Sequence, residues 1–174
     1  MKVVKFGGTS VANAEQISKI IKIVTADAGR RIVVVSAPGK RNKADTKVTD
    51  MLITLANTVI AGKNFEADLM AVVDRYAEIQ RDLKLPETVI KTIEADLRGR
   101  IKGRGKNDAQ FMDAMKAAGE DCNARVIAEA FTKAGFPARY VNPGEAGMLL
   151  SDDFGNAQVL DESYPKLAAL NNIK

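Results

Sequence analysis

The sequence predicts an α/β fold with a mainly parallel sheet. Three segments near the start of the chain carry this prediction: a short apolar strand, an amphipathic helix and a second apolar strand. A strand, a crossover helix and a parallel strand make a β-α-β unit, in which the helix packs against the sheet. Because open parallel sheets bind ligands at the carboxyl ends of their strands, we expect a functional site at that edge.

The first strand, within residues 2–10, runs into Gly7, Gly8 and two hydroxyl residues, after which the helix is expected to open. Since neither glycine has a Cβ, the backbone can approach a ligand closely there. The start of a helix offers unpaired N–H groups and a partial positive charge to an anion. Lys5 adds a full positive charge, so the turn has the properties of a phosphate site. Similar glycines also occur in turns that bind nothing, so both interpretations stay open.

The helix expected after this turn ends near Gly29, a residue typical of a helix C-terminus. Its apolar residues recur at helical spacing: Ala14, Ile17, Ile20, Ile21 and Val24. Residues 31–37 are then predicted as a strand, and the unbroken apolar run within it is typical of a parallel strand covered on both faces. Ser36 lies at the carboxyl end of that strand, either as a ligand contact or as a turn serine before Pro38.

Residues 38–47 are polar and basic and lack apolar periodicity, which predicts a mobile loop over the anion site. The next helix begins near Thr46–Asp50, where Thr46 or Thr49 is a candidate helix cap. Two further helices are expected within residues 65–97. Leu85-Pro86-Glu87 separates them, because proline is tolerated only in the first turn of a helix. This region carries no motif, so we assign it packing only.

Residues 98–106 hold the strongest basic run of the chain, with five lysines and arginines. A nucleic-acid interface would require aromatic residues for stacking or a recognisable binding module. Neither is present, so we expect a solvated loop and no nucleic-acid partner.

A helix containing Phe111 is expected next, and a separate helix is expected to start at residues 118–121 with Glu120 in its first turn. The helix dipole favours a carboxylate there by about 0.3 to 1 kcal/mol. Residues 138–141 and 148–151 are predicted as short strands, and residues 161–173 as a last helix. Asp152-Asp153 could hold Mg²⁺, but a simple turn is the favoured interpretation, so no residue is assigned as a metal ligand.

The composition is that of an ordinary globular domain: 174 residues, of which 46% are hydrophobic and 28% charged. No apolar run approaches the ~18 to 20 residues that span a bilayer, and Met1-Lys2 leads into a strand rather than a signal peptide. We therefore expect a cytoplasmic protein without a membrane partner. The chain has no histidine, which excludes histidine-based nucleophilic catalysis and histidine-ligated zinc. Cys122 is the single cysteine and is expected to be buried.

Residues 5–11, Lys-Phe-Gly-Gly-Thr-Ser-Val, resemble the N-terminal signature of aspartate kinases in the amino-acid kinase superfamily. The resemblance implies a three-layer α/β/α sandwich with a mainly parallel sheet, present here only in part and with a helical insertion at residues 65–97. Residues 1–174 would then form the N-terminal, amino-acid-substrate part of the kinase domain. No regulatory domain is expected.

The resemblance also implies a site. The residues expected to bind the phosphates of ATP are Lys5, Phe6, Gly7, Gly8, Thr9 and Ser36. Lys5 would be the catalytic cation, and Thr49 and Glu120 would bind L-aspartate. The implied reaction uses ATP and Mg²⁺ to phosphorylate the side-chain carboxylate of L-aspartate, as the first step toward lysine, threonine and methionine. A carboxylate acceptor with a pKa near ~3.9 is already ionised, so the reaction needs no general base.

Several parts of the family pattern are absent from these residues, including its Ser-Arg-Gly-Gly-Ser-Asp motif and most of its nucleotide-binding strands. We therefore expect the chain to be inactive without a complementing C-terminal half, and we expect either that half or a homo-oligomer as its protein partner. A sheet cut partway leaves an unpaired edge that invites pairing. One alternative is a non-catalytic piece that binds a small anion or a partner chain. A sibling kinase acting on glutamate or a nucleotide is a second alternative, disfavoured by Thr49 and Glu120 together with the opening string.

Overall fold

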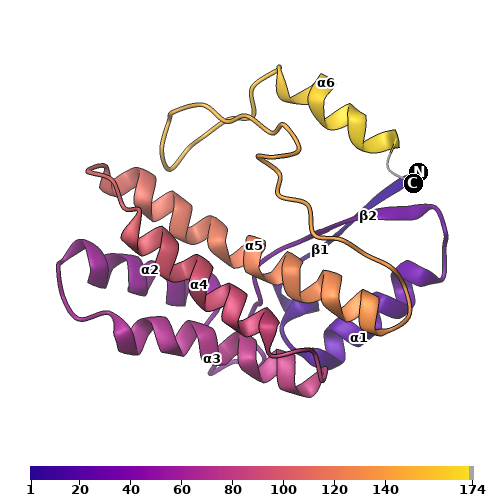
Figure 1. Ribbon diagram of the computed structural model, residues 1–174, viewed down its shortest axis with the longest axis horizontal. Helices are drawn as coiled ribbons and strands as arrows, with labels where there is room; N and C mark the ends of the chain where they lie inside the picture. The colour runs from indigo at the N-terminus through magenta and orange to yellow at the C-terminus, as the bar shows by residue number, and fades with distance from the viewer. Residues whose placement is uncertain (173–174) are drawn as a thin grey trace.

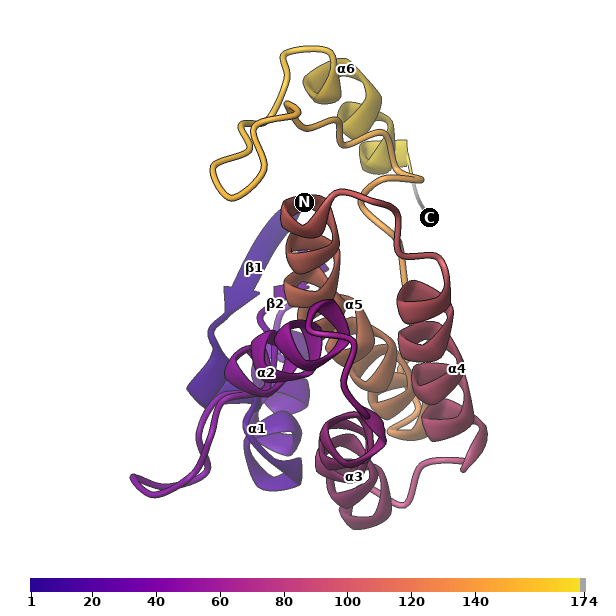
Figure 2. The same ribbon diagram turned by 90° about the vertical axis from the view of Figure 1, so that its left-hand side faces the viewer.

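The computed structural model describes residues 1–172, which form the α/β arrangement of Figures 1 and 2. In chain order the elements are β1 (Lys2–Phe6), the 3₁₀ turn η1 (Gly8–Val11), α1 (Ala14–Thr25), β2 (Arg30–Val35), α2 (Val48–Ile60), α3 (Glu66–Asp82), α4 (Thr88–Lys102), α5 (Asp108–Lys133), α6 (Ser163–Ala168) and η2 (Ala169–Asn172). Strands β1 and β2 pair in parallel through α1. The predicted β-α-β start and α/β class are confirmed.

One face of the two-stranded sheet packs against the helices. Side chains alternate between faces along a strand, and the register pairs Val4 with Val33 and Phe6 with Val35 on this covered face. Val35 is buried, and the other three pack partly against the core. The helices in Figure 2 lie on one side of the strands.

The opposite face of the sheet is open within residues 1–172. It carries Val3, Lys5 and Val34, and the side chains of Val3 and Val34 are 61% and 46% exposed. The expectation that residues 31–37 are covered on both faces is therefore wrong for the described part of the chain. The arrangement is the expected sandwich with one helical layer present, because none of the described helices crosses to this face.

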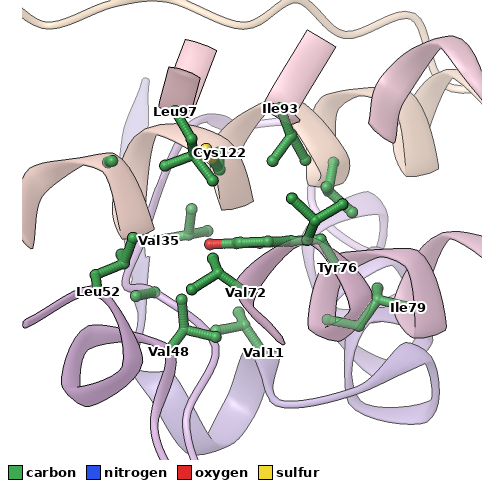
Figure 3. Packing of buried hydrophobic residues seen from close by; sticks show 14 of the residues in the cluster. Val11, Val35, Val48, Leu52, Val72, Tyr76, Ile79, Ile93, Leu97 and Cys122 are labelled. Atoms are coloured by element: carbon green, nitrogen blue, oxygen red, sulfur yellow. The ribbon is translucent and has the colours of Figure 1, made fainter. Parts of the chain in front are cut away.

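The core lies between the covered sheet face and α1 to α5. Figure 3 shows Tyr76 of α3 surrounded by apolar side chains from several of these elements. Its hydroxyl donates to the Gly119 carbonyl of α5 at 2.8 Å, which satisfies the one polar group of a fully buried ring. Cys122 is 1% exposed, as predicted, and burial raises the pKa of its thiol to about 12.

Helix α5 is continuous from Asp108 to Lys133, so the prediction of a separate helix starting at residue 118 is wrong. Gly119 suggests a helix break when only the sequence is considered, but in the structure this glycine has a packing role. A Cβ at this position would lie 2.7 Å from the Ala37 Cβ, so glycine lets α5 pass close to the end of β2. Gly135 follows the end of α5 with a φ of +88°, a conformation that glycine adopts readily after a helix.

The basic run is mostly helical, not a solvated loop. Helix α4 extends to Lys102, and its arginines form ion pairs with acidic residues, four positions earlier in two cases. Within α4, Arg98 pairs with Glu66 and Glu94, and Arg100 pairs with Asp96 and Asp121. Arg104, which follows α4, pairs with Asp108. These pairs neutralise much of the positive charge of the run.

The C-terminal segment contains less regular structure than predicted. Residues 138–141 form no strand, and within 148–151 only Leu150 pairs, in an isolated antiparallel bridge with Val159. Strand structure requires a neighbouring strand, and the β1–β2 sheet does not extend to either segment. The predicted last helix is α6 followed by η2, and Ile173 lies outside the described residues.

Candidate functional site

The turn after β1 differs from the one expected. Gly8–Val11 form a short 3₁₀ helix, and α1 begins only at Ala14. Asn13 caps α1 by accepting a hydrogen bond from the Gln16 amide at 3.0 Å. This cap sets the start of α1 beyond the glycines, so the predicted helix N-terminus at the glycines is wrong. The first amides of the 3₁₀ turn, on Gly8 and Thr9, have no partner within that turn.

The two glycines of the signature have different roles. A Cβ at Gly7 would meet no atom within 4 Å, whereas one at Gly8 would lie 3.1 Å from the Ala37 carbonyl oxygen. Gly39, in the loop after β2, donates to the Gly8 carbonyl at 2.8 Å. A Cβ on Gly39 would lie 2.6 Å from the Gly8 carbonyl carbon. Gly7 therefore leaves space for a ligand, while Gly8 and Gly39 let two loops touch.

Lys5 lies at the carboxyl end of β1 beside this turn. Its side chain is exposed on the open sheet face, next to Val34 in the register. It forms no salt bridge with any residue of the described chain. Its ammonium group is therefore available to an anion that approaches Gly7.

Ser36 follows β2 and is held from two sides. Its amide donates to the Phe6 carbonyl at 3.1 Å, and its carbonyl accepts from the Asn123 amide group of α5 at 2.7 Å. Asn123 is fully buried and its Oδ1 has no hydrogen-bond partner within residues 1–172. Sequence reasoning missed Asn123, although an amide next to Cys122 on an apolar helix face is a readable signal.

Thr49 lies in the first turn of α2, and no side chain caps this helix. Its N-cap is Lys47, so the interpretation of Thr46 or Thr49 as a cap is wrong. The Val48 amide instead donates to the Pro38 carbonyl at 3.1 Å. This bond joins the start of α2 to the loop that contacts Gly8, and it leaves the half-buried Thr49 hydroxyl without a capping role.

Glu120 lies in the middle of α5, where its side chain is exposed. A first-turn interaction with the helix dipole therefore does not explain it. Its neighbour Gly119 packs against Ala37, and a Cβ there would also lie 3.1 Å from Leu52 of α2. This packing brings the Glu120 position to the corner formed by the end of β2 and the start of α2.

The loop after β2, predicted to be mobile, is anchored at its far end. Asp45 accepts hydrogen bonds from the Arg41 backbone at 2.8 Å and from the Arg41 guanidinium at 2.6 and 2.8 Å. Arg41 also pairs with Glu78 of α3. Hydrogen bonds from the guanidinium hold the pKa of the Asp45 carboxyl well below its usual range.

Among the described residues, no group of three or more acidic, cysteine or histidine side chains is arranged to hold a metal ion. Asp152 and Asp153 form a turn, in which the Asn156 amide donates to the Asp153 carbonyl at 3.0 Å. None of the helices in residues 1–172 has both the length and the apolar character that crossing a bilayer requires.

Backbone contacts bring the turn after β1, the loop after β2 and the start of α2 to one corner of the molecule. Phe6 meets Ser36, Gly8 meets Gly39, and Pro38 meets the start of α2. Lys5 and the amides of the turn present positive charge, and Glu120 of α5 follows Gly119, which packs against Ala37 beside this corner. Such a corner can bind a molecule that carries both an anionic and a cationic group.

Comparison with known proteins identifies the family of the chain. The family model described as "Amino acid kinase family" matches residues 1–171. Aspartokinase 3 of Bacillus subtilis is 48% identical over 170 residues, which cover 98% of this chain and 37% of that protein. The crystal structure of Escherichia coli aspartokinase III with aspartate and ADP has a TM-score of 0.72 and 26% identity, covering 97% of this chain and 36% of the other.

A third relative is the aspartate kinase of Clostridium acetobutylicum, whose crystal structure has a TM-score of 0.64 and 28% identity, over 75% of this chain and 29% of that one. The chain thus spans little more than a third of the Bacillus and Escherichia proteins. The family match covers nearly all of it, and the structural similarity extends over the same residues. The chain belongs to the amino acid kinase family.

Proposed function

We propose that this chain forms the amino-acid-substrate side of an aspartate kinase, which transfers the γ-phosphoryl group of ATP to the side-chain carboxylate of L-aspartate. The product is 4-phospho-L-aspartate, at the entry to lysine, threonine and methionine synthesis in the cytoplasm. The observation that carries the proposal is the contact between the signature turn and the loop after β2, made by Gly8 and Gly39. The aspartokinase relatives, one crystallised with aspartate and ADP, support it.

Lys5 would bind the phosphate oxygens, together with the backbone of Gly7 and Gly8 and the Ser36 hydroxyl. A carboxylate must approach a polyanion, and each unit-charge pair at ~4 Å costs about 4 kcal/mol at an effective dielectric of ~20. Fixed positive potential at the transferring group offsets this repulsion. Mg²⁺ bound to ATP would add further positive charge, and Lys5 is the fixed cation that this chain would contribute.

Glu120 and Thr49 would bind L-aspartate. The Glu120 carboxylate would pair with the substrate ammonium group, a charge-assisted contact of about 1.5 to 3 kcal/mol. The Thr49 hydroxyl, which caps no helix, is available to a polar group of the substrate. The acceptor carboxylate of aspartate is ionised at neutral pH and needs no general base, which agrees with a chain that lacks histidine.

A hydroxamate assay for aspartyl phosphate tests this function. The chain is assayed alone and together with a second chain that supplies the nucleotide-binding part of the kinase domain. We expect product only in the mixture, and expect Lys5→Met to reduce turnover far more than aspartate binding. Unchanged turnover in Lys5→Met would reject Lys5 as the phosphate ligand, and product from the chain alone would reject the need for a second half.

A non-catalytic fragment that pairs with a partner chain is the second candidate. The open sheet face, with Val3 and Val34 exposed, favours it, because exposed apolar sheet surface invites association. Size-exclusion chromatography separates the outcomes: a compact monomer would reject pairing between copies. A dimer without product in the mixed assay would favour the non-catalytic interpretation.

A further inference from the structure

Arg75 is a buried cation that neither the fold nor the proposed chemistry has accounted for. It lies on α3 between the core residues Val72 and Tyr76, and it is 4% exposed. Its Nη2 donates to the Ala12 carbonyl at 2.6 Å and to the Gly39 carbonyl at 3.2 Å. Ala12 follows the 3₁₀ turn of the signature, and Gly39 belongs to the loop after β2. One nitrogen therefore bridges the two loops of the site.

This position is unfavourable for a charged group. The Nε and Nη1 atoms of Arg75 have no hydrogen-bond partner within residues 1–172, and burial lowers the pKa of its guanidinium. The nearest carboxylate, Asp45, is 3.7 Å from Nη2 and already bonded to Arg41. An apolar side chain of similar volume would fill this space at less cost in desolvation. The desolvation cost of the buried charge is therefore offset by the hydrogen bonds of Arg75 to the two loops.

The surrounding charges connect α3 to the same loop at two points. Arg75 donates to the Gly39 carbonyl, and Glu78, one turn further along α3, pairs with Arg41 of the same loop. Asp45 lies between the two arginines. Helix α3 thus fixes the course of the loop that touches the signature turn, and it does so without contributing a side chain to the site surface.

We propose that Arg75 is a positioning residue: it holds the signature turn and the loop after β2 together from beneath, which keeps Gly8 against Gly39. The nature of the ligand rests on the proposed function, whereas the geometry does not. Arg75 touches no ligand in this account. Arg75 acts indirectly: it maintains the Gly8–Gly39 contact, and this contact keeps the backbone amides and Ser36 in place.

Hydrogen exchange of the Gly39 amide, measured by NMR on the ¹⁵N-labelled full chain, tests the proposal directly. That amide donates to Gly8, so its protection reports the contact between the loops. In Arg75→Met we expect its exchange to accelerate by about tenfold or more while the core amides of α5 keep their protection. Arg81→Met is the matched control, because Arg81 is an exposed arginine on the same helix, and no change is expected there.

Unchanged Gly39 protection in Arg75→Met, or a loss of protection spread evenly over α5, would overturn the proposal. Should Arg75→Met not fold, Arg75→Lys decides, since lysine keeps the charge but presents a single ammonium group. Gly39 exchange that rises more than core exchange in Arg75→Lys supports positioning. An equal rise in both would show a purely structural role.

Titration with Mg·ATP separates this inference from the proposed function. If the wild-type chain shows no shifts at Gly7 and Gly8, the proposed function loses its support, and the exchange result still decides the role of Arg75. If the wild type binds, Arg75→Met should bind at least tenfold more weakly, and Arg81→Met should bind as the wild type does. Equal binding by wild type and Arg75→Met would overturn the positioning role.

Discussion

The helical half of the molecule and its site corner are held together in different ways. Helices α2 to α5 pack through apolar side chains around Tyr76 (Figure 3). The corner formed by residues 7–12 and 36–45 is held by backbone contacts between glycines and by buried polar groups, of which Arg75 and Asn123 are examples. The stability of the domain and the order of its site therefore depend on largely different contacts, and we expect substitutions in the two regions to affect them to different extents.

The largest expected effect is in the helical half. Leu97 of α4 is fully buried, and Leu97→Ala should lower the free energy of unfolding by about 2 to 5 kcal/mol, because the lost burial leaves a cavity. This free energy is measured by urea unfolding, monitored by circular dichroism. The exposed Leu149, in the C-terminal segment, is the control, and Leu149→Ala should change stability little. A similar small change in both variants would contradict the assignment of the core.

Gly39→Ala should affect the site corner next. The new Cβ would lie 2.6 Å from the Gly8 carbonyl carbon and 2.8 Å from the Thr9 amide nitrogen, so the two loops must separate. We expect the free energy of unfolding to fall by about 1 to 3 kcal/mol, the usual range for overpacking. The largest changes in NMR chemical shift should occur at residues 7–12. Gly7→Ala is the matched control because no atom lies within 4 Å of its Cβ position. Equal effects of the two variants would contradict the proposed contact.

A smaller effect is expected from Asp45→Asn, and it should depend on pH. The Asp45 pKa is lower in the folded protein, so the carboxylate stabilises the fold fully above its unfolded pKa of ~3.9, and this stabilisation is lost as the pH falls toward the folded pKa. For a partly exposed pair we expect about 0.2 to 1 kcal/mol at neutral pH. Urea midpoints of wild type and variant should therefore converge below pH 4.

Asp74→Asn is the control for that comparison, since Asp74 is exposed on α3. Its midpoint should follow the wild type at every pH. A wild-type advantage over Asp45→Asn that grows as the pH falls below 4 would have the wrong sign and would refute the ion pair.

Cys122 offers a probe that perturbs neither region. Its thiol pKa of about 12, against ~8.5 for a free cysteine, leaves about a thousandfold less thiolate at neutral pH. Together with 1% exposure, this predicts almost no reaction with a thiol reagent until the protein unfolds. Rapid labelling of the native chain would show that the helical half opens far more easily than its packing indicates.

Much of the fold was predictable because it depends on local patterns. The β-α-β start follows from two apolar strands around an amphipathic helix. The break between α3 and α4 falls at Leu85-Pro86-Glu87, as proline requires. The continuity of α5 was not predictable, because the reason for Gly119 is Ala37, a residue distant in the sequence. The prediction of strands after α5 failed for a similar reason, because a strand depends on a neighbouring strand that the local sequence does not reveal.

The site divides in the same way. Lys5, Gly7 and Gly8 could be predicted from a contiguous motif, and their ligand roles stay predictions. The residues that hold the corner were missed, although the signal was present: Arg75 and Asn123 are polar residues within otherwise apolar helix faces. A charged or amide side chain in such a face must find a buried partner, and the carbonyl partners on the loops could not be identified before the fold was known.

Titration of the ¹⁵N-labelled chain with Mg·ATP tests the central claim, that the turn after β1 binds the phosphates, most directly. The account predicts shifts at Gly7, Gly8 and Ser36 that Lys5→Met weakens at least tenfold, while the fold of the variant is unchanged. Shifts confined to another surface, such as the groove between α4 and α5 lined by Thr92 and Arg125, with none at the turn, would contradict it.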